Sequence, residues 1–241
     1  MGEIKQGILG GFSGKVGTVV GSTWKNVSYM RALALSVANP RTLRQLEQRS
    51  KFSMSMAFLR TLIPYVRVGY KNLGRNKTAF NAAMSYIMRH ALMGEFPDIT
   101  VDYRRVLVAR GNLTPAFDVT ATKEDGKIKM TWTDNSGMGD ALATDLAMPL
   151  AYNKKRAVSV YDFAAATRGD ATLELTLPAD WGDDPLAVYL AFHSEEQRSN
   201  TNSVCVLDEP YEGTGEDAGG NTGGTGGTGS GGEDPGDNPL G

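Results

Sequence analysis

Phe117-Asp-Val-Thr-Ala-Thr-Lys-Glu-Asp-Gly-Lys-Ile-Lys-Met-Thr-Trp132 contains two alternating runs joined by a tight-turn sequence. In the second run, Ile128, Met130 and Trp132 alternate with polar residues, which is typical of a β-strand with one buried face. The Asp125-Gly126 pair between the runs tolerates the positive φ angles of a two-residue hairpin turn. The stretch therefore predicts a β-hairpin that buries Trp132.

Short apolar runs recur along the rest of the C-terminal half. They cover residues 146–152, 157–161, 171–177, 187–192 and 203–206. Short strands at this spacing, with turn residues between them, indicate a β-sandwich. We therefore predict an all-β sandwich domain over residues 111–212.

The N-terminal half has a helical period instead. Apolar residues recur at the spacing of one helix face at Phe52, Met56, Leu59 and Ile63. Asn39 is the expected N-cap, Pro40 fits the first helical position, and Pro64 ends or kinks the helix. A second helix is predicted over residues 76–93, with Gly94 as its stop.

Glycine and β-branched residues dominate the segment before these helices. The pattern predicts a small β-ribbon over residues 16–20 and 23–30. At the other end, 13 of the last 29 residues are glycine, which predicts a disordered tail over residues 213–241. The fold class expected is α+β: a basic N-terminal α+β region (1–110), the sandwich (111–212) and the Gly/Thr-rich acidic tail.

Charge divides the chain in the same way. The net charge of the 241 residues is −2, but residues 1–110 carry 17 Lys and Arg against 5 Asp and Glu. Residues 111–212 carry 8 against 17, and residues 213–241 carry 0 against 5. Such an uneven distribution of charge indicates either that one segment binds an oppositely charged partner or that the segments attract each other.

The sequence is poor in cysteine and histidine, two residue types that often act in catalysis or bind metals. Cys205 is the single cysteine and only two histidines are present, so cysteine-based zinc sites and intrachain disulfides are excluded. The segment from Gly10 to Lys15 departs from a phosphate-binding loop, because Leu9 and Val16 replace its first glycine and its hydroxyl residue. We therefore expect no enzyme, no catalytic residues, no metal and no cofactor.

Two parts of the chain resemble known families. Asn39-Pro-Arg-Thr42, Gln45 and Arg49, with the upstream run Gly14-Lys-Val-Gly-Thr-Val-Val-Gly-Ser-Thr-Trp24, resemble a bacterial domain family of unknown function. Elements of this kind also occur in uncharacterised bacteriophage-like proteins, so the resemblance implies a phage-like structural protein without an assigned activity. The runs at 119–122, 128–132 and 189–192 resemble a fibronectin type III or Ig-like sandwich.

These observations favour a non-enzymatic binding or assembly protein. Its binding residues are expected on the basic surface, at Arg41, Arg44, Arg49, Lys51 and Arg60. The alternative is nucleic-acid binding by the same basic region, since Lys and Arg neutralise phosphates. The expected partner is a protein or a second copy, nucleic acid is possible, and no membrane is involved, because no run approaches the length of a membrane span. Without a secretory leader, the expected location is the cytoplasm or a particle assembled there.

Overall fold

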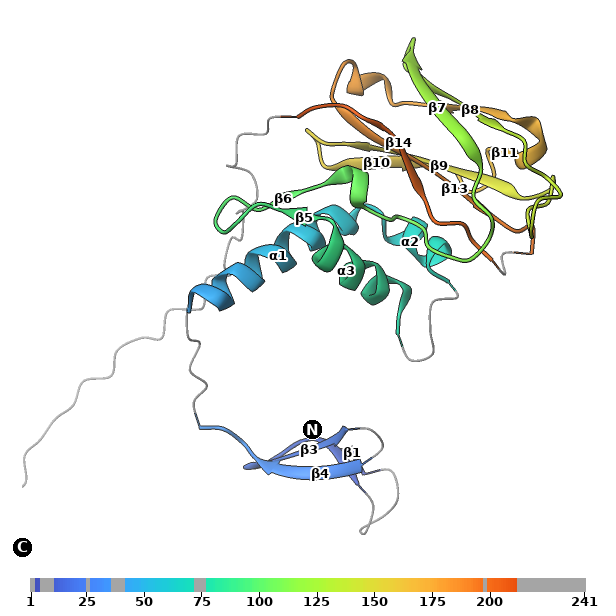
Figure 1. The fold of residues 1–241 in the computed structure, drawn as a ribbon. Coiled ribbons are helices and arrows are strands. Elements are labelled where there is room, and N and C mark those ends of the chain that lie inside the picture. The colour runs from blue at the N-terminus through green and yellow to red at the C-terminus, as the bar shows by residue number, and fades with distance from the viewer. Residues whose placement is uncertain are drawn as a thin grey trace, which may run out of the picture. The chain divides into compact units, whose positions relative to one another are not determined.

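The computed structural model describes residues 3–4, 11–24, 27–35, 42–71, 77–196 and 199–211. The chain forms two compact units, Met1–Leu46 and Glu47–Gly241 (Figure 1). The acidic tail expected over residues 213–241 lies outside the described residues, as do Asn39 and Pro40, the expected start of the first helix.

The first unit holds one antiparallel sheet in the order β1-β2-β3-β4. Its strands are β1 (Glu3–Ile4), β2 (Phe12–Val16), β3 (Val19–Trp24) and β4 (Val27–Ala32). The ribbon expected at residues 16–20 and 23–30 is corrected in its bounds, because a turn with Gly17 at φ 58° falls inside the first of these segments. Glycine adopts this left-handed conformation without a steric penalty, so the turn forms there.

The second unit contains a sandwich of two sheets, as predicted. One sheet has the order β10-β9-β13-β14, with β11 also paired to β9, and the other has the order β12-β8-β7. The strands are β7 (Phe117–Glu124), β8 (Lys127–Thr133), β9 (Leu146–Asn153), β10 (Val158–Tyr161), β11 (Ala166–Thr167), β12 (Thr172–Thr176), β13 (Leu186–His193) and β14 (Val204–Asp208). A separate pair, β5 (Leu92–Met93) and β6 (Thr100–Val101), follows the helices.

The predicted hairpin is confirmed. β7 and β8 pair antiparallel with Glu124 opposite Lys127, and the turn residues Asp125 and Gly126 have φ angles of 47° and 74°. Trp132 is buried, as the alternation in β8 requires.

Three helices lie in the described part of the chain, where two were expected. They are α1 (Leu43–Arg60), α2 (Ile63–Gly69) and α3 (Ala79–His90). Pro64 lies in the first turn of α2, where its missing N–H is not needed, so a second helix begins where the first was expected to end. α3 ends three residues before the expected bound, because Leu92 and Met93 pair with β6.

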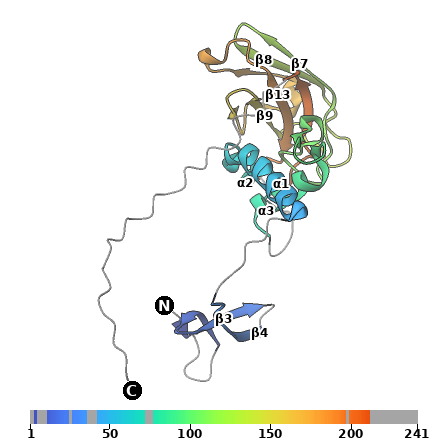
Figure 2. The same cartoon turned by 90° about the vertical axis from the view of Figure 1, so that its left-hand side faces the viewer.

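The three helices form a third layer on the outer face of the larger sheet (Figures 1 and 2). In β13, Ala187, Tyr189 and Ala191 belong to the core shared with the helices. The intervening residues Leu186, Val188, Leu190 and Phe192 belong to the core between the two sheets. Because side chains alternate across a strand, this one strand serves two cores.

The boundary expected between residues 110 and 111 does not divide the structure. The division lies between Leu46 and Glu47, and the helices share a buried core with the sandwich. The physical reason is that β9 and β13 are buried on both faces, so the sheet needs a covering layer, to which the preceding helices contribute.

Candidate binding surfaces

Four of the five predicted basic residues lie on one described helix, but not on one surface. Arg44, Arg49 and Arg60 are exposed on α1, and Lys51 is half-buried; Arg41 lies outside the described residues. At 3.6 residues per turn, Arg49 and Arg60 share one side of α1, whereas Arg44 and Lys51 lie roughly 140–180° away from it. The structure therefore separates the predicted set into two groups.

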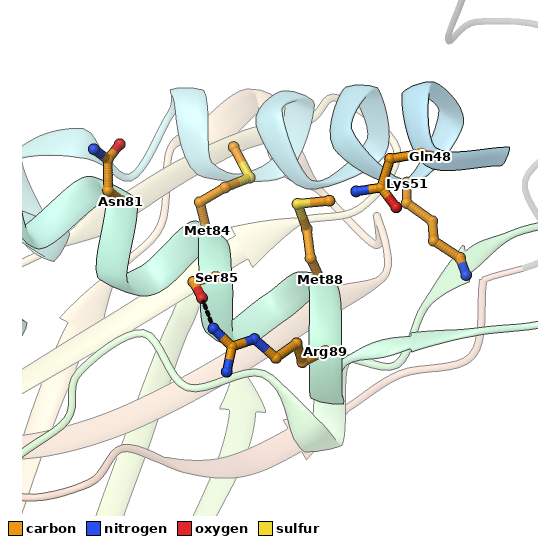
Figure 3. Close-up of a pocket in the computed structure, with 7 residues that line it drawn as sticks. All are labelled: Gln48, Lys51, Asn81, Met84, Ser85, Met88 and Arg89. Carbon is orange, nitrogen blue, oxygen red and sulfur yellow. Dashed lines mark hydrogen bonds between the residues drawn. The ribbon is translucent and has the colours of Figure 1, made fainter. Parts of the chain in front are cut away.

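Lys51 contributes to a groove that the sequence did not predict. The groove lies between α1 and α3, has a volume of about 450 Å³ and is lined by Gln48, Lys51, Asn81, Met84, Ser85, Met88 and Arg89. Met84 and Met88 point from α3 toward α1 (Figure 3). Methionine is flexible and polarisable, so two methionines give an apolar floor that adapts to different side chains.

Cationic side chains stand at the rim of the groove. Lys51 Nζ lies 2.5 Å from Glu47 Oε1, and the Arg89 guanidinium donates to the Ser85 hydroxyl (Figure 3). Glu47 offsets one of the two positive charges, and the rim keeps a net positive charge from Arg89. A ligand that combines apolar and acidic groups suits this arrangement.

The N-terminal sheet presents a second surface that sequence reasoning missed. Gly21 in β3 lies opposite both Gly14 and Met30, and Val19 lies opposite both Val16 and Ala32. Directly opposed residues share a face, so these two rows lie on one side of the sheet. That side carries no charge in either row, and Val16 and Met30 are 54% and 71% exposed.

Charge gathers on the other side of the same sheet. There Lys15, Val20 and Arg31 form the opposed row. Lys15 therefore lies within a paired strand, rather than in the loop that a phosphate site would need. The alternation that could have revealed the two faces is hidden in the sequence by glycines, which contribute no side chain to either one.

His193 and the Cys205 thiol are held in surroundings that limit their reactivity. Both ring nitrogens of His193 lie 2.8 Å from backbone carbonyl oxygens, those of Ser194 and Phe163. Burial raises the pKa of the Cys205 thiol to about 12. Among the described residues, no group of three or more His, Cys, Asp and Glu could hold a metal ion, and no helix is long and apolar enough to cross a bilayer.

These features define an α+β protein with a two-sheet sandwich, a helical layer and a separate N-terminal sheet. The chain belongs to the family of unknown function DUF6266, whose family model matches residues 11–207. The resemblance to a family of unknown function was expected from N-terminal residues alone. The family model extends further, because it includes the sandwich as well. A solved structure, the fn3 domain of the human collagen alpha-1(XX) chain, is 15% identical over 42% of this chain and 94% of that chain, with a TM-score of 0.26. No curated protein matches the chain.

Proposed function

We propose that this chain is a non-enzymatic binding or assembly protein, of the kind found among phage-like structural proteins. The observation that carries the proposal is the face of the N-terminal sheet whose described rows carry no charge, where Val16 and Met30 are largely exposed.

The size of the sheet supports the proposal. β4 is an edge strand whose six residues are all exposed, including Val27, Tyr29 and Met30. A small antiparallel sheet is stable when one face packs on a second layer, and unpaired edges and apolar faces favour association. The proposed role of the sheet is to pack against the same face of a second copy, which would supply the second layer.

The experiment is a measurement of the mass of the full chain by sedimentation velocity after nuclease treatment. We expect associated species that dissociate on dilution. Met30→Glu places a charge on the apolar face and should abolish the association through this face, whereas Arg31→Glu, its neighbour on the opposite face, should leave the association within twofold. A chain that stays monomeric at every concentration contradicts assembly through this face.

Nucleic-acid binding is the second candidate function. It is favoured by the exposure of Arg44, Arg49 and Arg60 on α1. If it is correct, the mass of the purified chain falls on nuclease treatment, and binding weakens steeply with salt because each neutralised phosphate releases counterions. Arg49→Glu with Arg60→Glu should then weaken binding more than Arg44→Glu alone, because Arg49 and Arg60 share one side of the helix.

A further inference from the structure

The loop between β8 and β9 exposes two large apolar side chains. Residues 134–145 read Asp-Asn-Ser-Gly-Met-Gly-Asp-Ala-Leu-Ala-Thr-Asp, and Met138 and Leu142 are 55% and 59% exposed. Large apolar side chains exposed within a short polar loop are a mark of interaction sites. The loop also contains Asp134 and Asp140 but no Lys or Arg.

The loop backbone is held in one conformation by its own hydrogen bonds. The Gly137 N–H donates to the Ala141 carbonyl at 2.9 Å, and the Ala141 N–H donates to the Met138 carbonyl at 3.1 Å. Ala141 is 1% exposed, so the middle of the loop is buried rather than free in solvent. Met138 and Leu142 therefore project from a fixed base, which lowers the entropy that an interface loses on forming.

A fully buried arginine ties the loop to the sandwich. Arg168 donates to Asp145 Oδ2 at 3.1 Å, to Asn135 Oδ1 at 2.8 Å and to the Thr114 carbonyl at 2.9 Å. Asn135 and Asp145 stand near the two ends of the loop, so one guanidinium fixes both. Burying an arginine is costly unless it is paired, and here it is paired with the loop itself.

The carboxylates of Asp134 and Asp140 in this loop are ionised at neutral pH. Hydrogen bonds from the Ser136 side chain and backbone hold the pKa of Asp134 below its usual range, and hydrogen bonds from Thr114 do the same for the pKa of Asp140. Asp134 and Asp140 are exposed, so their charges are accessible to a partner that contacts the loop. The loop 134–145 thus combines two exposed apolar side chains with two negative charges.

The groove between α1 and α3 has the complementary composition. It offers the apolar floor of Met84 and Met88 with Lys51 and Arg89 at its rim. It belongs to a segment, residues 47–110, with 11 Lys and Arg against 4 Asp and Glu. All seven lining residues come from α1 and α3, so the loop of the same chain does not fill the groove.

We propose that the loop 134–145 of one copy docks into the α1–α3 groove of a second copy, with Met138 and Leu142 against the methionine floor and the aspartates facing Arg89 and Lys51. The proposal rests on the function proposed above and names the partner of this groove. The contact joins two different surfaces, so each copy keeps one free loop and one free groove, and assembly continues head to tail. A contact of this small size is weak and sensitive to salt.

The test uses full-length chains that all carry Met30→Glu, so that association through the N-terminal sheet is removed. Leu142→Glu disables the loop and leaves the groove intact, and Arg89→Glu disables the groove and leaves the loop intact. Each variant alone should be monomeric, with association at least tenfold weaker than in the Met30→Glu parent. An equimolar mixture of the two should form a heterodimer that does not grow further, because it contains one intact loop and one intact groove.

Val158→Glu and Arg67→Glu are the controls, since they replace an apolar residue and an arginine by glutamate at exposed positions outside the loop and the groove. Both controls should associate like the Met30→Glu parent. A mixture of the Leu142 and Arg89 variants that stays monomeric overturns the proposal, as does a parent that is itself monomeric at ~100 µM and low salt. Neither result affects assembly through the N-terminal sheet, which the Met30→Glu comparison tests separately.

Discussion

The Tyr65 hydroxyl in α2 donates a hydrogen bond of 2.9 Å to the Met148 carbonyl in β9. Both residues are fully buried, and burial raises the pKa of Tyr65 far above its ordinary value. The bond connects the helical layer to the central strand of the larger sheet, between residues 83 positions apart in the sequence. The helices and the sandwich therefore depend on each other for their polar as well as their apolar contacts.

The first prediction follows from this connection. Tyr65→Phe keeps the ring but leaves the Met148 carbonyl without its donor, which costs about 1–3 kcal/mol of unfolding free energy. Because the layers share a core, the helical signal in circular dichroism and the fluorescence of the buried Trp132 and Trp181 should change at the same denaturant concentration. Two separated transitions would show that the helices and the sandwich fold independently.

The second prediction concerns Arg168 and Asp145. Arg168→Ala leaves the Asp145 carboxylate buried without its charged partner and should lower the unfolding free energy by about 3–5 kcal/mol. The paired change Arg168→Met with Asp145→Leu removes both charges and should recover part of that loss. Chemical denaturation of the three chains checks this, and a double variant less stable than Arg168→Ala would contradict the explanation.

The sandwich strands could be predicted from the sequence because their local pattern determines them. In β8, Ile128, Met130 and Trp132 face one core and the residues between them face solvent, so alternation marks the strand. β9 and β13 are continuously apolar because both of their faces are buried. That continuity is the signal for a covering layer, and it argues against a domain boundary between the helices and the strands.

The candidate surfaces were harder to predict because they join distant segments. Arg44, Arg49 and Arg60 are apparent in the sequence as a basic group, but helix geometry places them on different sides of α1. The groove depends on Met84 and Met88 meeting Lys51 across two helices, and the spacing of residues on one helix carries no information about its neighbour.

The third prediction concerns the single thiol. Burial raises the pKa of Cys205 to about 12, and the negative charge of Asp208 contributes in the same direction. The thiolate is the reactive form, so alkylation by iodoacetamide at pH 8 should be slower than alkylation of the urea-unfolded chain by at least ~100-fold. Mass spectrometry of the modified fraction with time measures both rates, and equal rates would contradict the assignment.

The fourth prediction concerns the pH dependence of stability at Asp184. A hydrogen bond from Arg156, 2.7 Å from Nε to Oδ2, and a second from Asn153 hold the pKa of Asp184 well below its ordinary value. Because the folded state favours the ionised carboxylate, the resulting stability is fully present above the unfolded pKa of about 4 and is lost as the pH falls toward the lower folded value. Asp184→Asn should therefore lower the melting temperature at pH 7, and the difference from the unsubstituted chain should shrink at pH 3.

Asp183→Asn, the same change at the exposed neighbouring residue, is the control and should have little effect at either pH. A melting-temperature difference for Asp184→Asn that is constant from pH 7 to pH 3 would mean that the ionised carboxylate does not contribute to stability.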